Sequence, residues 1–209
     1  MRARLTARPP AAGLNIGSSA LLAALLLLAW SSLLATEAPQ LSLDEILTRT
    51  TVIPPARVAF REERHNPMLQ EPLVLTGYLE YLDAGVLRKV IESPAPQAFL
   101  IRADEVVIER DGETRRLSLS KSRVLKTMLG AIEAILAGQP ENLESLFDHE
   151  ISGSDDQWSV RLTPQSPRLK RQLVGLQVNG DSESTSSIRF DLKSGEWHSI
   201  TIMRDAPEQ

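Results

Sequence analysis

Cysteine is missing from all 209 residues of the sequence. A chain without cysteine forms no disulfide and offers no lipobox thiol for a lipid anchor, so its packed core must hold the fold unaided. It also lacks the thiolate ligands of most structural zinc sites, and its three histidines, His65, His149 and His198, are far apart in sequence. We therefore expect no metal ion and no organic cofactor to bind stoichiometrically.

The short motifs of the common enzyme classes are absent as well. The sequence contains no G-x-S-x-G nucleophile elbow, no P-loop and no G-x-G-x-x-G fingerprint. Carboxylates are paired at Glu62-Glu63 and Asp155-Asp156, but adjacent side chains in a strand point to opposite faces, and we expect both pairs to be surface charge. We expect the basic clusters Arg115-Arg116 and Arg168…Lys170-Arg171 to be solvated too. These observations favour a binding protein over a hydrolase or a transferase.

No apolar run is long enough for a spanning helix, which needs about 20 apolar residues. The longest run, Ala20 to Trp30, follows three arginines and precedes the small-residue segment 31–35. This order is typical of a secretory signal peptide. We predict a signal peptide over residues 1–35, with cleavage after Ala35 or Ala38, and one domain over residues 36–209. An uncleaved N-terminal anchor is the alternative, and in either case the chain is exported.

Positive charge is in the minority. The formal net charge is −4, and removal of the three signal-peptide arginines leaves 20 basic against 27 acidic residues, or −7. An acidic exported domain argues against a nucleic-acid partner and against binding to anionic membranes through a basic patch.

The longest helical pattern lies mid-chain, from Lys121 to Gln139. Its apolar residues recur with helical spacing on one face: Leu125, Met128, Leu129, Ile132, Ile135 and Leu136. The opposite face carries mostly small side chains: Lys126 and Glu133 share it with Thr127, Gly130, Ala134 and Ala137. Periodicity alone is consistent with a core helix packed on a sheet and with a lid that closes over a cavity.

Alternation of apolar and polar residues predicts strands on both sides of this helix. We expect six strands before it, at 57–62, 73–81, 86–92, 98–102, 105–110 and 113–119. Five more follow it, at 149–152, 158–162, 173–179, 187–193 and 196–203. Asp111-Gly112 predicts a tight hairpin turn, because both residues tolerate a positive φ.

Two short helices complete the pattern. Ser42 and Glu45 form a capping-box motif that starts a helix from Leu43 to about Thr50. Pro140 starts another helix that runs to Phe147, with Leu143, Leu146 and Phe147 turned inward. We predict an α+β, mostly β fold: residues 57–119 and 149–203 form one curved antiparallel sheet of about eleven strands, and residues 121–147 are helical on its concave face.

Five segments, taken in this order, resemble the LolA/LolB-like periplasmic lipoprotein carriers. Ala59-Phe60-Arg61-Glu62 is similar to the first-strand signature of that family, and Gly77-Tyr78-Leu79-Glu80-Tyr81 to its second-strand glycine–aromatic segment. Val86-Leu87-Arg88 and Phe99–Asp104 match the segments that follow. The middle helices are then followed by Trp158–Pro164, as the family's W-x-L-x-L-x-P stretch is.

The resemblance implies an unclosed β-barrel whose concave face, covered by helices, holds acyl chains. It implies a periplasmic monomer without enzyme activity that takes lipoprotein or other lipid cargo from an inner-membrane transporter to an outer-membrane acceptor. The lipid-lining residues it implies are Phe60, Leu75, Leu79, Ile101, Val106 and Ile108 from the sheet, and Leu125, Met128, Leu129, Ile132 and Leu136 from the lid.

One departure from the family concerns the lid. Carriers of the best-known type have Arg-Pro after the second strand, and that arginine hydrogen-bonds the lid, whereas this chain has Asp83-Ala84. A carboxylate cannot donate hydrogen bonds as a guanidinium does. Either another residue such as Arg88 holds the lid, or the cargo is a different lipid or a polyene-type pigment. A structural assembly protein whose helices simply fill the half-barrel is the remaining alternative.

Overall fold

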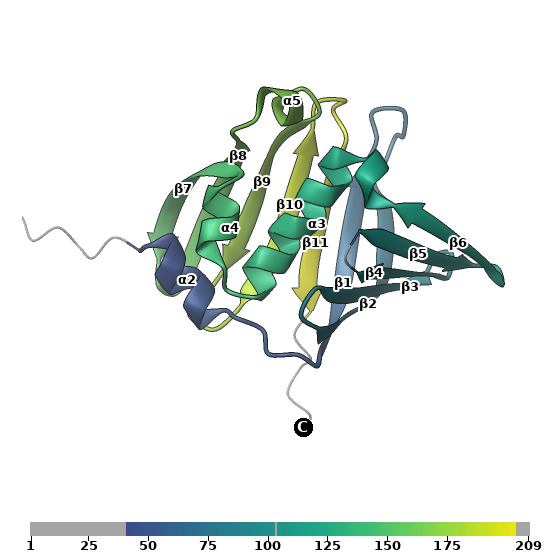
Figure 1. The fold of residues 1–209 in the computed structure, drawn as a ribbon, viewed down its shortest axis with the longest axis horizontal. Coiled ribbons are helices and arrows are strands. Elements are labelled where there is room, and N and C mark those ends of the chain that lie inside the picture. The colour runs from purple at the N-terminus through teal and green to yellow at the C-terminus, as the bar shows by residue number, and fades with distance from the viewer. Residues whose placement is uncertain (1–40, 103, 204–209) are drawn as a thin grey trace, which may run out of the picture. The chain divides into compact units, whose positions relative to one another are not determined.

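The computed structural model describes residues 41–102 and 104–203. In that part of the chain, eleven strands form one antiparallel sheet with helices against one of its faces (Figure 1). The predicted signal peptide, residues 1–35, lies outside the described residues and stays a prediction. Among the residues described, no helix is both long and apolar enough to cross a membrane.

The strands form two consecutive meanders. The first contains β1 (Ala56–His65), β2 (Leu73–Asp83), β3 (Val86–Ser93), β4 (Gln97–Arg102), β5 (Glu105–Arg110) and β6 (Glu113–Ser118). The second contains β7 (Phe147–Ser154), β8 (Gln157–Pro164), β9 (Leu173–Gly180), β10 (Thr185–Leu192) and β11 (Trp197–Met203). The predicted turn between β5 and β6 is confirmed, since Asp111 and Gly112 have φ of 52° and 79°.

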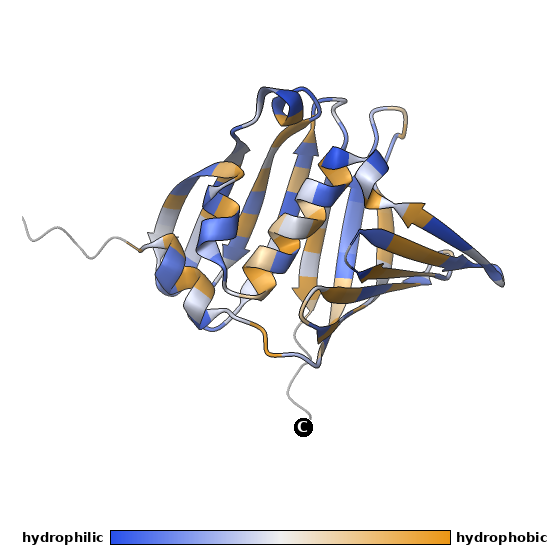
Figure 2. Cartoon of the chain, in the orientation of Figure 1, coloured by the Kyte–Doolittle hydropathy of each residue, from blue (hydrophilic) through white to orange (hydrophobic). Residues whose placement is uncertain are grey.

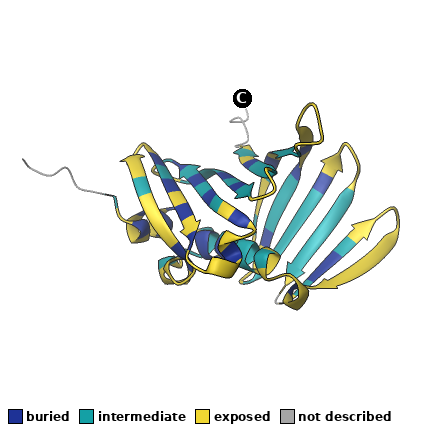
Figure 3. Ribbon diagram, turned by 90° about the horizontal axis from the view of Figure 1, so that it is seen from above, coloured by how far each residue is buried: buried dark blue, intermediate teal, exposed yellow. Residues whose placement is uncertain are grey.

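The meanders join where the first strand meets the last. β1 pairs with β2 on one side and with β11 on the other, so the sheet order is β6-β5-β4-β3-β2-β1-β11-β10-β9-β8-β7. The edge strands β6 and β7 do not pair with each other, and the sheet stays open. The predicted unclosed barrel, with its helices on the concave face, is confirmed (Figure 3).

The helices are α2 (Leu43–Arg49), the 3₁₀ turn η1 (Leu119–Lys121), α3 (Arg123–Leu136), α4 (Pro140–Glu144) and α5 (Pro167–Lys170). Helix α3 starts two residues later than predicted because the Ser122 hydroxyl caps it, accepting a hydrogen bond from the Leu125 amide. Helix α5 was not predicted from the sequence.

The helix predicted to run to Phe147 is shorter than expected. α4 ends at Glu144, and Phe147 instead opens β7 opposite Pro164 of β8. Phe147 is buried as predicted. The prediction that Leu146 is turned inward is wrong, because Leu146 is 37% exposed. The strand ladder takes Phe147 out of the helix, and Leu146 is left in the connection between them.

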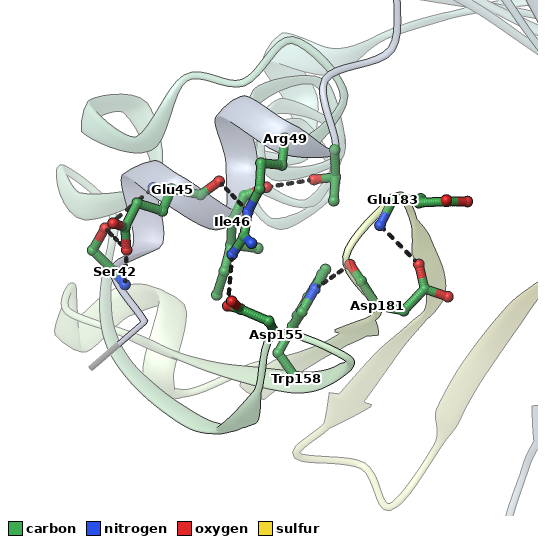
Figure 4. A network of polar contacts seen from close by, with 9 residues as sticks. Ser42, Glu45, Ile46, Arg49, Asp155, Trp158, Asp181 and Glu183 are labelled. Atoms are coloured by element: carbon green, nitrogen blue, oxygen red, sulfur yellow. Dashed lines mark hydrogen bonds and ion pairs between the residues drawn. The ribbon is translucent and has the colours of Figure 1, made fainter. Parts of the chain in front are cut away.

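The hydrophobic core lies between the concave face and the helices. Figure 2 shows apolar and polar residues alternating along the strands and along the helices. The largest side chains that are almost fully buried include Trp158, Phe60 and Phe147. The Trp158 indole Nε1 donates to the Asp181 carbonyl at 2.7 Å, so its one polar group is satisfied (Figure 4).

Helix α2 is fastened at both ends. The predicted capping box is confirmed: Ser42 Oγ accepts from the Glu45 amide at 3.2 Å, and the Glu45 carboxylate accepts from the Ser42 amide at 3.0 Å. At the other end, Arg49 Nη2 contacts Asp155 Oδ1 at 3.2 Å, which ties α2 to the turn between β7 and β8 (Figure 4).

Substitution of Gly77 should lower the free energy of unfolding. A Cβ at this position would lie 1.9 Å from the Val90 carbonyl oxygen on β3, so Gly77→Ala must push β3 away from β2. We expect a loss of about 1–3 kcal/mol, measured by urea unfolding. Gly130→Ala in α3 is the matched control, because a Cβ there meets no atom within 4 Å. It should gain about 0.5–1 kcal/mol, and equal losses in the two variants would contradict this account.

Candidate functional site

The helices cover the concave face unevenly. Over β8 to β10 nearly all concave-face apolar side chains are buried, whereas over β2 to β5 buried side chains such as Leu75 and Val106 are interspersed with half-buried ones (Figure 3). Cross-strand pairing arranges the side chains over β2 to β5 in two rows. One row is Tyr81, Leu87, Ile101 and Val106, and the next is Leu79, Lys89, Phe99 and Ile108.

Helix α3 turns two alanines and one isoleucine toward the core. Ala131, Ala134 and Ile135 are its buried residues, although the helical pattern had placed Ala134 on the face opposite the apolar one. The predicted apolar face is therefore rotated, because alanine allows the closest approach of the helix to the core cluster. As a result, the larger side chains of Met128, Leu129, Ile132 and Leu136 stay half-buried.

A cavity of about 110 Å³ lies between α3 and the row that starts at Tyr81. Its apolar walls come from α3, from three strands and from the 3₁₀ turn: Leu129, Leu136, Tyr81, Val86, Leu87, Ile101 and Leu119. An apolar cavity of about 150 Å³ binds benzene. The closed cavity thus has room for a small apolar group, and a whole acyl chain requires α3 to move away from the strands.

The predicted lipid-lining residues occupy four kinds of position. Ile101, Leu129 and Leu136 line the cavity. Those that are half-buried nearby on the concave face or on α3 are Leu79, Ile108, Met128 and Ile132. Leu125 is 37% exposed, whereas Phe60, Leu75 and Val106 are buried. Contact with lipid stays a prediction for all of them.

Four apolar residues of the cavity were not predicted from the sequence: Tyr81, Val86, Leu87 and Leu119. Tyr81 shares the strand parity of Leu75 and Leu79, and this parity was a signal that would have found it. Leu87 is placed by its pairing with Tyr81, and Leu119 by the 3₁₀ turn that follows β6. Both depend on tertiary structure that the alternation of a single segment does not contain.

The polar side of α3 is held by two turns of the sheet. Lys126 Nζ lies 2.5 Å from Asp104 Oδ1, at the turn between β4 and β5. The Glu133 carboxylate lies beside Gly85, in the turn between β2 and β3. Arg88, the candidate latch, is on the convex face, where its Nη1 donates to Glu80 Oε2 at 3.2 Å. Exposed ion pairs contribute about 0–1 kcal/mol, so α3 is only weakly fastened along this side.

Glu62 is the main correction to the sequence analysis. It was expected to be surface charge, but its side chain is 2% exposed. Along β1 it follows Phe60 on the concave face, whereas Glu63 is on the convex face with Arg61. The parity that predicts a buried Phe60 also places Glu62 inside, and this signal was present in the sequence.

Three basic side chains surround the Glu62 carboxylate. Arg64 donates from Nε to Oε1 at 2.9 Å and from Nη2 to Oε2 at 3.2 Å. Lys89 Nζ donates to Oε2 at 2.5 Å, and His198 Nδ1 lies 3.5 Å from Oε1. The Lys89 ammonium also lies 4.7 Å from the centre of the Phe60 ring. Both oxygens of the buried carboxylate are therefore satisfied.

These contacts change the titration of the buried pair. Burial alone would raise the pKa of Glu62, but the His198 contact and the charges of Lys89 and Arg64 outweigh it and hold that pKa well below its usual value. Burial lowers the pKa of Lys89, against the attraction of Glu62. At neutral pH the carboxyl group is ionised.

A metal site has no candidate among the described residues, where no three His, Asp or Glu side chains lie together in a suitable arrangement. The expectations that neither a metal nor an organic cofactor binds stay predictions, which elemental analysis and absorption spectroscopy of the purified chain would test.

Comparison with known proteins begins with a family model described as outer membrane lipoprotein carrier protein LolA-like, which matches residues 35–206. No curated protein gives a significant match. Among solved structures, a LolA superfamily protein from Nitrosomonas europaea is 15% identical over 80% of this chain and 96% of its own, with a TM-score of 0.40. The Mycobacterium tuberculosis lipoprotein LppX is 11% identical over the same shares, with a TM-score of 0.41. With similarities this low, assignment to a family rests on the family model.

Proposed function

Because the chain belongs to the LolA-like family of outer membrane lipoprotein carrier proteins, we propose that it is a periplasmic carrier without enzyme activity. It binds the acyl chains of a lipoprotein or a related lipid against the concave face and moves them toward the outer membrane. An inner-membrane donor and an outer-membrane acceptor are its partners in this proposal, and it acts as a monomer.

One observation carries the proposal: two large apolar side chains of α3 border a cavity instead of being buried in the core. Leu129 and Leu136 border a cavity with Leu87 and Ile101, and Phe99 in the neighbouring row is only half-buried. A protein whose helices simply filled its half-barrel would bury these side chains to the extent seen over β8 to β10. Half-buried apolar side chains beside a cavity are what an acyl site requires before its ligand arrives.

The energetic task of such a site is large. Each methylene taken out of a membrane costs about 0.8 kcal/mol, so a chain of about 16 carbons costs on the order of 12 kcal/mol in water. A binding surface for the whole chain needs more space than the closed cavity offers. We propose that α3 swings away from β2 to β5, where the contact of Lys126 with Asp104 is the ion pair that must break. Met128 suits such a surface, because its flexible side chain adapts to different chains.

Two alternatives follow from particular residues. Asp83-Ala84 in place of the family Arg-Pro favours a carrier of another lipid or of a polyene-type pigment. The burial of Phe60, Leu75 and Val106 is what a structural assembly protein would show. Native mass spectrometry of the protein purified from its host separates the three, because co-purified lipoprotein, another lipid or no lipid identifies the carrier, the alternative binder or the filled core.

Leu129→Trp tests the proposed acyl site. The indole would occupy the cavity, so we expect displacement of a fluorescent fatty-acid probe to show at least a tenfold loss of affinity. The urea unfolding midpoint should change little, because the cavity has room for the added volume. In a close-packed core the same substitution would cost about 1–3 kcal/mol.

Val74→Trp is the matched control. Val74 is 40% exposed and lies on the convex face of β2, opposite Glu63. It should leave both the probe affinity and the midpoint unchanged. The proposal fails if wild-type protein does not bind the probe, or if Leu129→Trp lowers the midpoint and leaves the affinity as it was.

A further inference from the structure

The cluster around Glu62 carries more positive than negative charge. Arg64 and Lys89 are opposed by one carboxylate, so the cluster has a net charge of +1, and His198 adds to it when protonated. In the two described strands that meet here, β1 and β11, Glu62 is the only carboxylate on the concave side. A surplus cation beside apolar packing is costly unless an anion compensates it.

Glu62 also fixes the positions of its neighbours without using all their donors. Its oxygens engage Nε and Nη2 of Arg64 and Nδ1 of His198. Among the described residues, no hydrogen bond is made by Arg64 Nη1 or by His198 Nε2. These two side chains are 32% and 34% exposed, against 2% for Glu62. The cluster is therefore an ordered set of donors with an accessible outer side.

The position of the cluster relative to the cavity is fixed by strand register. On β2, Tyr81 lines the cavity and Leu75 lies opposite Glu62. Six residues of strand separate them, or about 20 Å. The hydrocarbon core of a bilayer is about 30 Å thick, so one acyl chain spans about 15 Å. A chain whose end lies in the cavity would bring its headgroup to within about 5 Å of the cluster, measured along the strand.

We propose that Arg64 and His198, positioned by Glu62, bind the anionic headgroup, a carboxylate or a phosphate, of the lipid whose chain occupies the α3 cavity. Lys89 supplies the remaining charge, and its stem runs from the row of Leu79 and Phe99 over Phe60 to Glu62. The concave face thus has an apolar end and a cationic end, which matches an anionic amphiphile. This inference rests on the proposed function and narrows its cargo to lipids that carry a negative charge.

Arg64→Gln is the test, with Arg61→Gln as its matched control. Arg61 is on the same strand, but it is on the convex face and pairs with Glu63. Two probes share one chain: a pyrene-labelled hexadecanoic acid and its methyl ester. Wild-type protein should bind the acid about tenfold more tightly than the ester, a difference of about 1.4 kcal/mol. Arg64→Gln should bring this ratio to about one and leave the ester affinity unchanged, and Arg61→Gln should keep the wild-type ratio.

His198→Gln gives a second measurement in case Arg64→Gln does not fold, and it should lower the ratio in the same way. Inorganic phosphate alone, at millimolar concentration, should not displace the acid probe. Displacement by phosphate would show a free-anion site and overturn the headgroup assignment. Equal wild-type affinity for acid and ester, or an equal loss of both in Arg64→Gln, also overturns it and leaves the carrier intact. If neither probe binds wild-type protein, the proposed function itself fails, and this inference fails with it.

Discussion

Replacing Glu62 with glutamine is expected to destabilise the fold by about 3–5 kcal/mol at neutral pH. The amide has nearly the same shape as the carboxylate but no charge. Lys89, whose side chain is 14% exposed, would then stay in the interior beside Arg64 without a counter-charge. Removing one member of a buried ion pair is costly for this reason, even where the intact pair adds little to stability. Urea unfolding followed by circular dichroism measures the difference.

The effect should depend on pH in a defined direction. The folded-state pKa of Glu62 lies below the ordinary value of 4.5. The stabilisation by its charge is therefore fully present above about pH 4.5 and is lost as the pH falls through the lowered pKa. We expect the gap between wild type and Glu62→Gln to be present at neutral pH and to shrink as the pH falls below about 4.5.

Glu63→Gln provides the control on the neighbouring residue. Glu63 is on the convex face and is paired with the exposed Arg61, so its loss should cost about 0–1 kcal/mol. The double variant Glu62→Gln/Lys89→Met should recover part of the stability, because it removes the stranded charge as well. Equal losses in the two glutamine variants would contradict a buried role for Glu62.

Phe60→Ala is expected to cost about 3–5 kcal/mol, as large aromatic-to-alanine changes in cores do. Phe60 is 0% exposed and lies under the Lys89 ammonium, so its loss leaves a cavity and removes a cation–π contact. The resemblance to lipoprotein carriers placed Phe60 in the lipid-binding surface, whereas its burial indicates a core role. Urea unfolding distinguishes the two roles, because an aromatic that only lined an open lipid surface would be removed at little cost.

Phe99→Ala is the matched comparison on the same face. Phe99 is half-buried in the row of Leu79 and Ile108, next to the row that lines the cavity, and it packs against the core from its edge. Its removal should cost about 1–2 kcal/mol, in proportion to the smaller buried area. It should also lower the affinity for the fatty-acid probe. If Phe60→Ala lowered the affinity for the fatty-acid probe and left the unfolding midpoint unchanged, Phe60 would belong to the lipid-binding surface.

Local patterns in the sequence were enough to predict most of the strands and helices. Alternation predicted all eleven strands, and helical periodicity together with the capping motifs predicted α2 and α3. Asp111-Gly112 formed the expected hairpin because its positive φ values are a property of those two residues. These features depend on neighbours a few positions away, so one sequence contains them. The resemblance to the family also rested on short segments and their order, which the sequence displays directly.

Three features were decided only by the tertiary structure. Hairpin pairing does not reveal that β1 joins β11, because this contact links the two ends of the domain. The rotation of α3 toward Ala134 followed from close packing against the core, whereas periodicity favoured the larger side chains. The cluster of Glu62 with Lys89 and His198 needed strands far apart in sequence to lie side by side. Sequence parity could have placed Glu62 inside the fold, but only the assembled sheet supplied the cations that make an ionised carboxylate stable there.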